Sequence, residues 1–220
     1  FTHQYRFAAA ESVNKDKVPR AISIILLGGI VSAFIGPSVA NFSKDVFSNH
    51  MYVGSYLSLA VLTFLPSIFF MFYNNTSKID ISVKYSGRGY LELVSQPRFL
   101  QAVISSAFGY AIMTFLMTGT PLSMHVMDGI SLNKTSIVIQ IHVACMFLPS
   151  LIAGNLVKKI GHSKMMYVGV GLYCITIVIS LFDQSFLNYM FALVFLGFGW
   201  NFLFISGTSL LVLTYKEEEK

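Results

Sequence analysis

Apolar residues along the chain gather into six long stretches, and charged residues are confined to the segments between them. None of the stretches contains Asp, Glu, Lys or Arg. They are Ala21–Asn41, Tyr52–Tyr73, Phe99–Pro121, Ser136–Val157, Met165–Phe182 and Leu187–Tyr215. Crossing a bilayer core about 30 Å thick takes about 20 residues of α-helix. The pattern therefore predicts six membrane-spanning segments.

These segments are predicted to be helices rather than strands. Within lipid every backbone N–H and C=O must be paired inside the protein, so only helices and closed barrels span a membrane. Barrel strands are about 10 residues long and alternate in polarity. The stretches here are about twice as long and are apolar on all sides. The expected fold class is therefore an all-α membrane protein.

The basic residues predict the orientation of the chain. Of the 15 Lys and Arg residues, all except Lys44 and Lys134 lie in alternate connections. Cytoplasmic loops of membrane proteins carry an excess of Lys and Arg. Residues 1–20, 74–98, 158–164 and 216–220 are therefore predicted to lie on the cytoplasmic side.

Composition agrees with a membrane protein. The chain is 55% hydrophobic and 11% charged, whereas soluble domains carry about 25% charged residues. The net charge of +5 follows from the basic cytoplasmic loops, so it does not call for a nucleic-acid partner. Cys145 and Cys174 both lie inside apolar stretches, which argues against a disulfide framework.

Small residues recur every four positions along the first stretch, at Gly28, Ser32, Gly36 and Ala40. This spacing places them on one helix face, and small faces allow helices to approach closely in lipid. Pro37 is expected to weaken the helix beside Gly36. Tight packing alone and a bending helix at a moving interface both remain open.

The third stretch has a more polar face, and this face is expected to point into the helix bundle because polar groups facing lipid are costly. It carries Ser106, Tyr110, Thr114, Met117 and Pro121. The face is a candidate wall of a transport pathway. Hydrogen bonding between helices is the alternative.

His142 is the one histidine inside the apolar stretches. An ionisable side chain within the membrane is by default a functional candidate. His142 is therefore predicted to contact a ligand or a proton. A neutral histidine that bonds to a neighbouring helix would give the same pattern.

The last stretch contains Gly197, Gly199, Trp200 and Asn201 close together. Softened helices often build substrate sites in transporters, so Trp200 and Asn201 are candidates for substrate contact. A glycine notch used only for packing is the alternative. A glycine-rich phosphate loop, paired carboxylates within a stretch and a metal-spaced His/Cys set are all missing from the sequence, so no enzyme is predicted.

The segment 154–164 has Gly154, Leu156, Gly161 and Lys164 at fixed spacing. It resembles the cytoplasmic loop motif Gly-x-Leu-x-Asp-x-x-Gly-x-x-basic of the major facilitator superfamily. Lys158 stands where the motif has its acid, which fits the second, degraded copy between helices 8 and 9. The run from Gly28 to Pro37 is similar to the family's fifth-helix motif associated with antiporters, without its closing glycine pair.

Five further segments resemble a bacterial subgroup of this family, most of whose members have no assigned substrate. They are 6–10, 118–122, 140–142, 146–150 and 199–204. The resemblance covers the chain from the end of helix 4 through helix 10 of a twelve-helix parent, so the chain is expected to be an internal piece. It implies three parts: residues 1–73, which end the N-terminal half; residues 74–98, the central cytoplasmic loop; and residues 99–220, helices 7 to 10.

The family also implies a function, namely ion-gradient-driven transport of a small solute by alternating access around a central cavity. We predict Tyr110, Thr114, His142, Trp200 and Asn201 as substrate contacts, without a metal or cofactor. Residues that pack or gate the helices are predicted to be Gly28, Ser32, Gly36, Pro37, Gly154 and Gly161. The expected protein is a monomer in the cytoplasmic (inner) membrane.

Proton-coupled efflux of an apolar or planar compound is the first expectation for the transported solute, with His142 as the proton site. Uptake of a nutrient or vitamin is the alternative. From outside the transporters, a membrane-embedded enzyme such as an acyl transferase and a non-transporting receptor or scaffold also remain open. Measuring solute flux into proteoliposomes distinguishes a transporter from a membrane-embedded enzyme and from a non-transporting receptor or scaffold.

Overall fold

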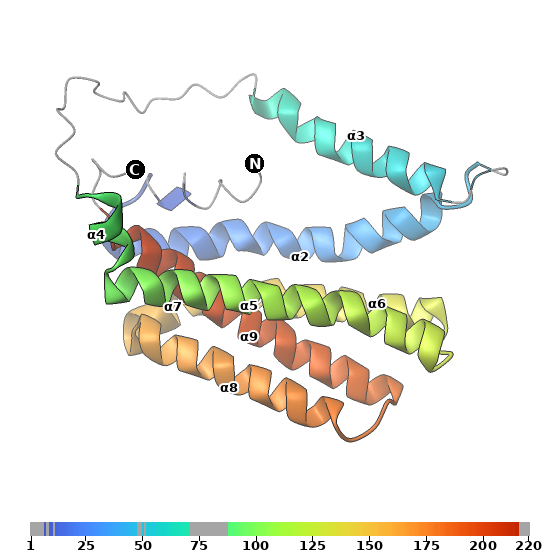
Figure 1. Ribbon diagram of the computed structural model, residues 1–220. Helices are drawn as coiled ribbons and strands as arrows, with labels where there is room; N and C mark the ends of the chain where they lie inside the picture. Colours follow the sequence, from blue (N-terminus) through green and yellow to red (C-terminus); the bar gives the residue numbers. More distant parts are fainter. Residues whose placement is uncertain are drawn as a thin grey trace. The chain divides into compact units, whose positions relative to one another are not determined.

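The computed structural model describes residues 7, 9–10, 12–47, 50, 52–70 and 88–215 (Figure 1). Most of the segment 1–11, most of the predicted central loop and the tail 216–220 lie outside the described residues. The predictions that fall there are not tested.

The described chain is helical. Its α-helices are α2 Val18–Ser43, α3 Val53–Phe70, α4 Tyr90–Val94, α5 Pro97–Leu122, α6 Leu132–Phe147, α7 Ser150–Ile160, α8 His162–Ser180 and α9 Phe186–Val212. A short 3₁₀ turn, Lys15–Lys17, precedes α2, and a π-helical turn, Ser123–Met127, extends α5. The all-α prediction is confirmed.

Five segments of the described chain are long and apolar enough to cross a membrane. They are Lys15–Ser43, Pro97–Met127, Leu132–Ile160, His162–Ser180 and Phe186–Val212. Each overlaps one of the predicted stretches. The predicted second span, Tyr52–Tyr73, shows a shorter apolar helical segment, Val53–Leu65, within the described residues. The predicted count of six spans is therefore not confirmed.

The chain divides into two compact units, residues 34–86 and residues 1–33 with 87–220. In the smaller unit, the end of α2 and α3 form a helical hairpin. The Ser55 hydroxyl donates to the Ala40 carbonyl over 2.6 Å, and the Tyr52 N–H donates to the Lys44 carbonyl over 2.9 Å. The predicted division into residues 1–73, 74–98 and 99–220 stays a prediction.

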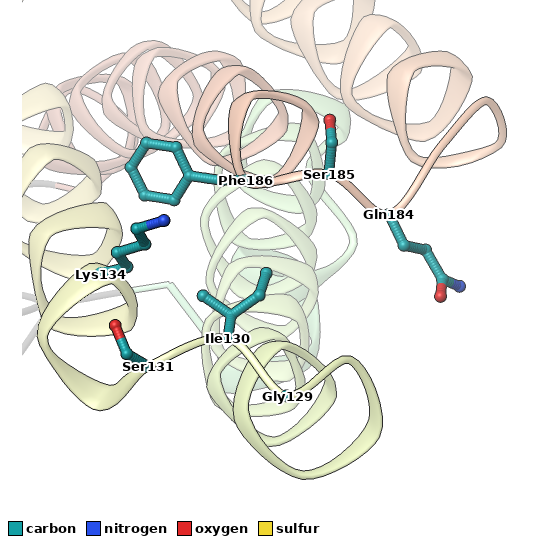
Figure 2. A pocket seen from close by; sticks show the side chains of 7 residues that line it. All are labelled: Gly129, Ile130, Ser131, Lys134, Gln184, Ser185 and Phe186. Atoms are coloured by element: carbon teal, nitrogen blue, oxygen red, sulfur yellow. The ribbon is translucent and has the colours of Figure 1, made fainter.

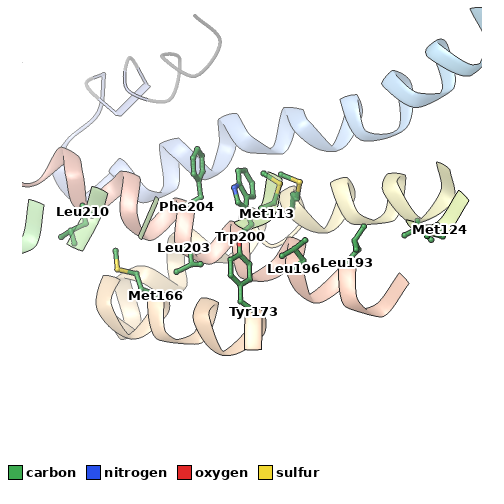
Figure 3. Close-up of a cluster of buried hydrophobic side chains, with 13 residues drawn as sticks. Met113, Met124, Met166, Tyr173, Leu193, Leu196, Trp200, Leu203, Phe204 and Leu210 are labelled. Atoms are coloured by element: carbon green, nitrogen blue, oxygen red, sulfur yellow. The ribbon is translucent and has the colours of Figure 1, made fainter. Parts of the chain in front are cut away.

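In the larger unit, α9 is the central helix. It packs against α5, α6 and α8 (Figure 1). Its inward side chains form the main apolar core with residues of these neighbours, including Met113, Met166 and Tyr173 (Figure 3). Helix α9 therefore sets the positions of the helices around it.

Glycines allow the neighbours of α9 to approach its backbone. A Cβ at Gly197 would lie 2.9 Å from the His142 carbonyl oxygen of α6, and one at Gly199 would lie 2.9 Å from the Gly169 carbonyl oxygen of α8. A Cβ at Gly207 would overlap the Ser106 hydroxyl of α5. Each glycine thus serves a different neighbouring helix, as small residues do in membrane bundles.

The predicted fourth span is broken into α6 and α7 at Pro149. Proline has no N–H and cannot continue the hydrogen-bond ladder of a helix. Past the break, the Leu151 N–H donates to the Leu148 carbonyl, three residues back, over 3.2 Å. The two helices together still have the length and apolar character of one membrane crossing.

Gly161 alone connects α7 to α8. Its φ of 86° lies in the left-handed region, where glycine is favoured because it has no Cβ. The exposed side chains of Lys158 and Lys159 precede this turn. This conformation favours glycine at position 161, and the predicted role of Gly161 in packing or gating stays a prediction.

Candidate functional site

Four aromatic side chains from three helices form a cluster. Trp200 and Phe204, one turn apart on α9, stack with ring centroids 4.6 Å apart and planes inclined by 19° (Figure 3). Tyr110 of α5 lies edge-on to Trp200, with ring centroids 6.2 Å apart and planes inclined by 61°. Phe147 of α6 also lies edge-on to Trp200, with ring centroids 5.8 Å apart and planes inclined by 84°. The structure therefore brings together two of the predicted contact residues, Tyr110 and Trp200.

A cavity of about 380 Å³ lies beside this cluster. Its walls come mainly from α5 and α9, with one residue from the segment before α2, and they include Tyr110 and Phe204. The lining residues are Phe7, Val103, Ser106, Ala107, Tyr110, Phe204, Thr208 and Leu211. Its size falls in the range of small-molecule sites, about 300–1,000 Å³, and such sites are mostly apolar with a few polar groups.

His142 is fully buried between α6 and α9. Its Nδ1 lies 2.7 Å from the Leu193 carbonyl oxygen. A carbonyl oxygen only accepts, so Nδ1 carries the hydrogen in this contact. Nε2 is buried and has no hydrogen-bond partner among the described residues. His142 does not line the cavity, and its contact with a ligand or proton stays a prediction.

Asn201 is also fully buried, and its amide bridges the break between α6 and α7. Its Nδ2 donates to the Met146 carbonyl and to the Ser150 hydroxyl, both over 2.7 Å. These partners stand on either side of Pro149. Asn201 thus satisfies polar groups at the interruption of the helix, while its Oδ1 has no partner among the described residues.

The other predicted residues lie outside the cavity. Thr114 is exposed on α5 and is not part of the lining. Gly28 and Ser32 are exposed on α2. Apart from the neighbouring residues and backbone of α2 itself, no described atom lies within 4 Å of a Cβ placed at Gly28. Helix α2 runs through Pro37 without interruption. Roles of Gly28, Ser32, Gly36 and Pro37 in packing or gating stay predictions.

Gly154 lies at a close approach between α7 and α2. A Cβ there would be 3.0 Å from Arg20 Cα and from the Ser23 hydroxyl. Any larger residue would push these two helices apart. The sequence pattern alone did not identify α2 as the neighbour of Gly154, and the predicted role of Gly154 in packing or gating stays a prediction.

A second cavity, of about 440 Å³, lies between the α5–α6 and α8–α9 connections (Figure 2). The Lys134 ammonium stands 5.9 Å from the centre of the Phe186 ring in its wall. At the end of α5, the Tyr189 hydroxyl donates to the Asp128 carboxylate over 2.6 Å and lies 2.8 Å from the Ser123 hydroxyl. This network ties the π-helical turn to α9.

Ser106 lies on the predicted polar face of α5, but neither Ser106 nor Thr208 is among the predicted site residues. Both line the first cavity. The signal was their spacing, since Ser106 is one turn from Tyr110 and Thr208 one turn from Phe204. Within the described part of the chain, no group of three or more His, Cys, Asp and Glu side chains could hold a metal ion.

The family model of the Major Facilitator Superfamily matches residues 6–220. The chain belongs to this superfamily. Several curated relatives are transporters, and no solved structure matches the chain significantly.

The riboflavin transporter RfnT of Brucella anthropi is 35% identical over 222 aligned positions, covering 100% of this chain and 56% of that protein. Two uncharacterized MFS-type transporters of Bacillus subtilis, YddS and YdeG, are 27% and 28% identical over 95% of this chain and 52% of their own lengths. The chain thus spans about half the length of the curated relatives it matches.

Proposed function

We propose that the protein is a secondary transporter that takes up a small, neutral, planar heterocycle of the riboflavin type by alternating access. The observation that carries this proposal is the 35% identity to a riboflavin transporter along the whole chain. The aromatic cluster beside the cavity supports it, because stacked aromatic side chains favour flat rings. Of the solutes considered from the sequence, this favours vitamin uptake over efflux of an apolar compound.

The test is uptake of labelled riboflavin by cells that cannot synthesise it and that express the full-length protein. We expect accumulation that saturates with concentration and collapses when the ion gradients across the membrane are dissipated. Replacing Trp200 by alanine removes the ring that stacks on Phe204, and should lower uptake at least tenfold at equal amounts of protein in the membrane. Absence of riboflavin accumulation by the unmodified protein would contradict the proposal.

Proton coupling through His142 is part of the proposed function. A glutamine at this position still offers a hydrogen-bond donor to the Leu193 carbonyl but cannot take up a proton. We expect His142→Gln to reduce the dependence of riboflavin uptake on external pH, while the protein remains in the membrane. Gln140→Ala, two residues away, is the control and should leave that dependence intact.

His142→Ala tests the same idea without a replacement donor. Unchanged transport and an unchanged pH profile in both His142 variants would show that the coupling group lies elsewhere in the protein.

The proposed setting is the cytoplasmic membrane, with the protein acting as a monomer and residues 1–20, 74–98, 158–164 and 216–220 on the cytoplasmic side. The distribution of basic residues supports this orientation. In this orientation the connections that line the cavity beside Lys134 lie on the outer side of the membrane.

A further inference from the structure

The polar side chains that the described residues contribute to the wall of the cavity beside Tyr110 are all of one kind. Among the described residues that line it, the polar side chains are the hydroxyls of Ser106, Tyr110 and Thr208, and none is charged. An ionised group of a ligand would find no opposite charge among these described residues, and burying an unpaired charge is strongly unfavourable. The wall therefore favours an uncharged occupant.

Thr208 shows where that occupant would make hydrogen bonds. The residue is 2% exposed, and its Oγ1 has no hydrogen-bond partner among the described residues. A buried hydroxyl without a partner costs free energy. Thr208 contributes to the cavity wall, and its Oγ1 lies buried behind that wall. A rotation about the Cα–Cβ bond to another staggered rotamer would turn the hydroxyl toward the cavity, where a ligand can supply the missing partner.

Ser106 stands in the same wall because α5 and α9 are close together at Gly207. A Cβ at Gly207 would overlap the Ser106 hydroxyl and lie 2.8 Å from the Ala102 carbonyl oxygen. Gly207 directly precedes Thr208 in the chain. The close approach of the two helices thus sets the Ser106 hydroxyl against the part of α9 that carries Thr208.

We propose that Ser106 and Thr208 form a hydrogen-bonding subsite for the amide-type edge of a neutral planar heterocycle whose ring lies against Tyr110 and Phe204. A hydroxyl can both donate and accept, so a pair of hydroxyls matches an edge that alternates C=O and N–H. This assignment rests on the proposed function, since riboflavin carries such an edge at its imide. To that function the assignment adds two residues, Ser106 and Thr208, that would select the ligand.

The first experiment measures riboflavin uptake by the full-length protein carrying Thr208→Val, which keeps the side-chain shape and removes the hydroxyl. We expect KM to rise about tenfold with the maximal rate within twofold of the parent, because one hydrogen bond to the ligand is lost. Thr208→Ser keeps a hydroxyl, so its KM should lie within about threefold of the KM of the unmodified protein. Ser106→Ala should also raise KM.

The matched control is Thr176→Val. Thr176 is as buried as Thr208, at 2% exposed, and its hydroxyl bonds to the Ala192 carbonyl of α9 over 3.1 Å. Its loss should lower the amount of stable protein and leave KM unchanged. If Thr176→Val and Thr208→Val raise KM equally, Thr208 acts through helix packing and the subsite is overturned.

A second measurement changes the ligand and needs no variant. Riboflavin methylated at its imide nitrogen lacks the N–H of that edge. The unmodified protein should take it up with a KM about tenfold higher, and Thr208→Val should discriminate less between the two ligands. Equal KM values for both ligands in the unmodified protein would overturn the subsite.

Failure of the subsite and failure of the proposed function give different results. Riboflavin uptake with an unchanged KM in Thr208→Val overturns the subsite and leaves the transport function in place. Absence of riboflavin uptake in the unmodified protein overturns both.

Discussion

Replacing Gly197 by alanine should prevent α6 and α9 from packing as they do and should leave little stable protein. The added Cβ would lie 2.9 Å from the His142 carbonyl oxygen and 3.0 Å from the Met146 backbone nitrogen. These are backbone atoms, so α6 itself would have to shift. Overpacking of this kind costs about 1–3 kcal/mol, and sometimes more.

The measurement is the melting temperature of the full-length protein in detergent, together with its yield. Gly171→Ala is the matched control, because Gly171 lies inside α8 with open space around its Cβ position. We expect the control to keep or slightly raise the melting temperature, since alanine favours helix by about 1 kcal/mol over glycine. If both variants melt at the same temperature, the inference that α6 packs closely against α9 at Gly197 is wrong.

Replacing Asn201 by leucine should be the most damaging change of a polar side chain in α9. It removes the hydrogen bonds to the Met146 carbonyl and the Ser150 hydroxyl and leaves both groups at the Pro149 break without these donors. Buried groups that lose a partner cost about 1–3 kcal/mol, although hydrogen bonds between membrane helices average about 0.6 kcal/mol. We expect about 2 kcal/mol, measured by thermal unfolding.

Pro149→Ala provides the control, because it restores an N–H at the break and allows the helix to continue from α6 into α7. In that background the Asn201 amide is no longer needed at the interruption, so Asn201→Leu should cost much less. A double-mutant cycle measures this coupling. Additive losses of stability would mean that Asn201 stabilises α9 for a reason unrelated to the break.

The membrane-spanning helices could be predicted from the sequence because the length and uniform apolarity of a segment depend on local composition alone. The five long segments all overlap predicted stretches. The interruption at Pro149 was not predicted. Counting apolar residues does not detect it, and many prolines are accommodated inside helices, as Pro37 is in α2.

The site was predicted less completely, because its assembly depends on contacts between helices. Tyr110 and Trp200 were predicted from separate stretches, and their ring centroids lie 6.2 Å apart. Sequence spacing identifies a helix face but does not tell which neighbour covers it. For this reason the place of Thr208 in the cavity wall and the two partners of the Asn201 amide could not be anticipated. Thr114 is exposed, and its contact with substrate stays a prediction.

The aromatic cluster gives this part of the protein its own optical reporter. The chain contains a single tryptophan, and its indole is 3% exposed and stacked on Phe204, which lines the cavity. The near-ultraviolet emission of this chain therefore comes mainly from one place, the wall beside the cavity. A flat ligand that absorbs in the same spectral range would quench that emission on entering, so occupancy becomes visible without an attached dye.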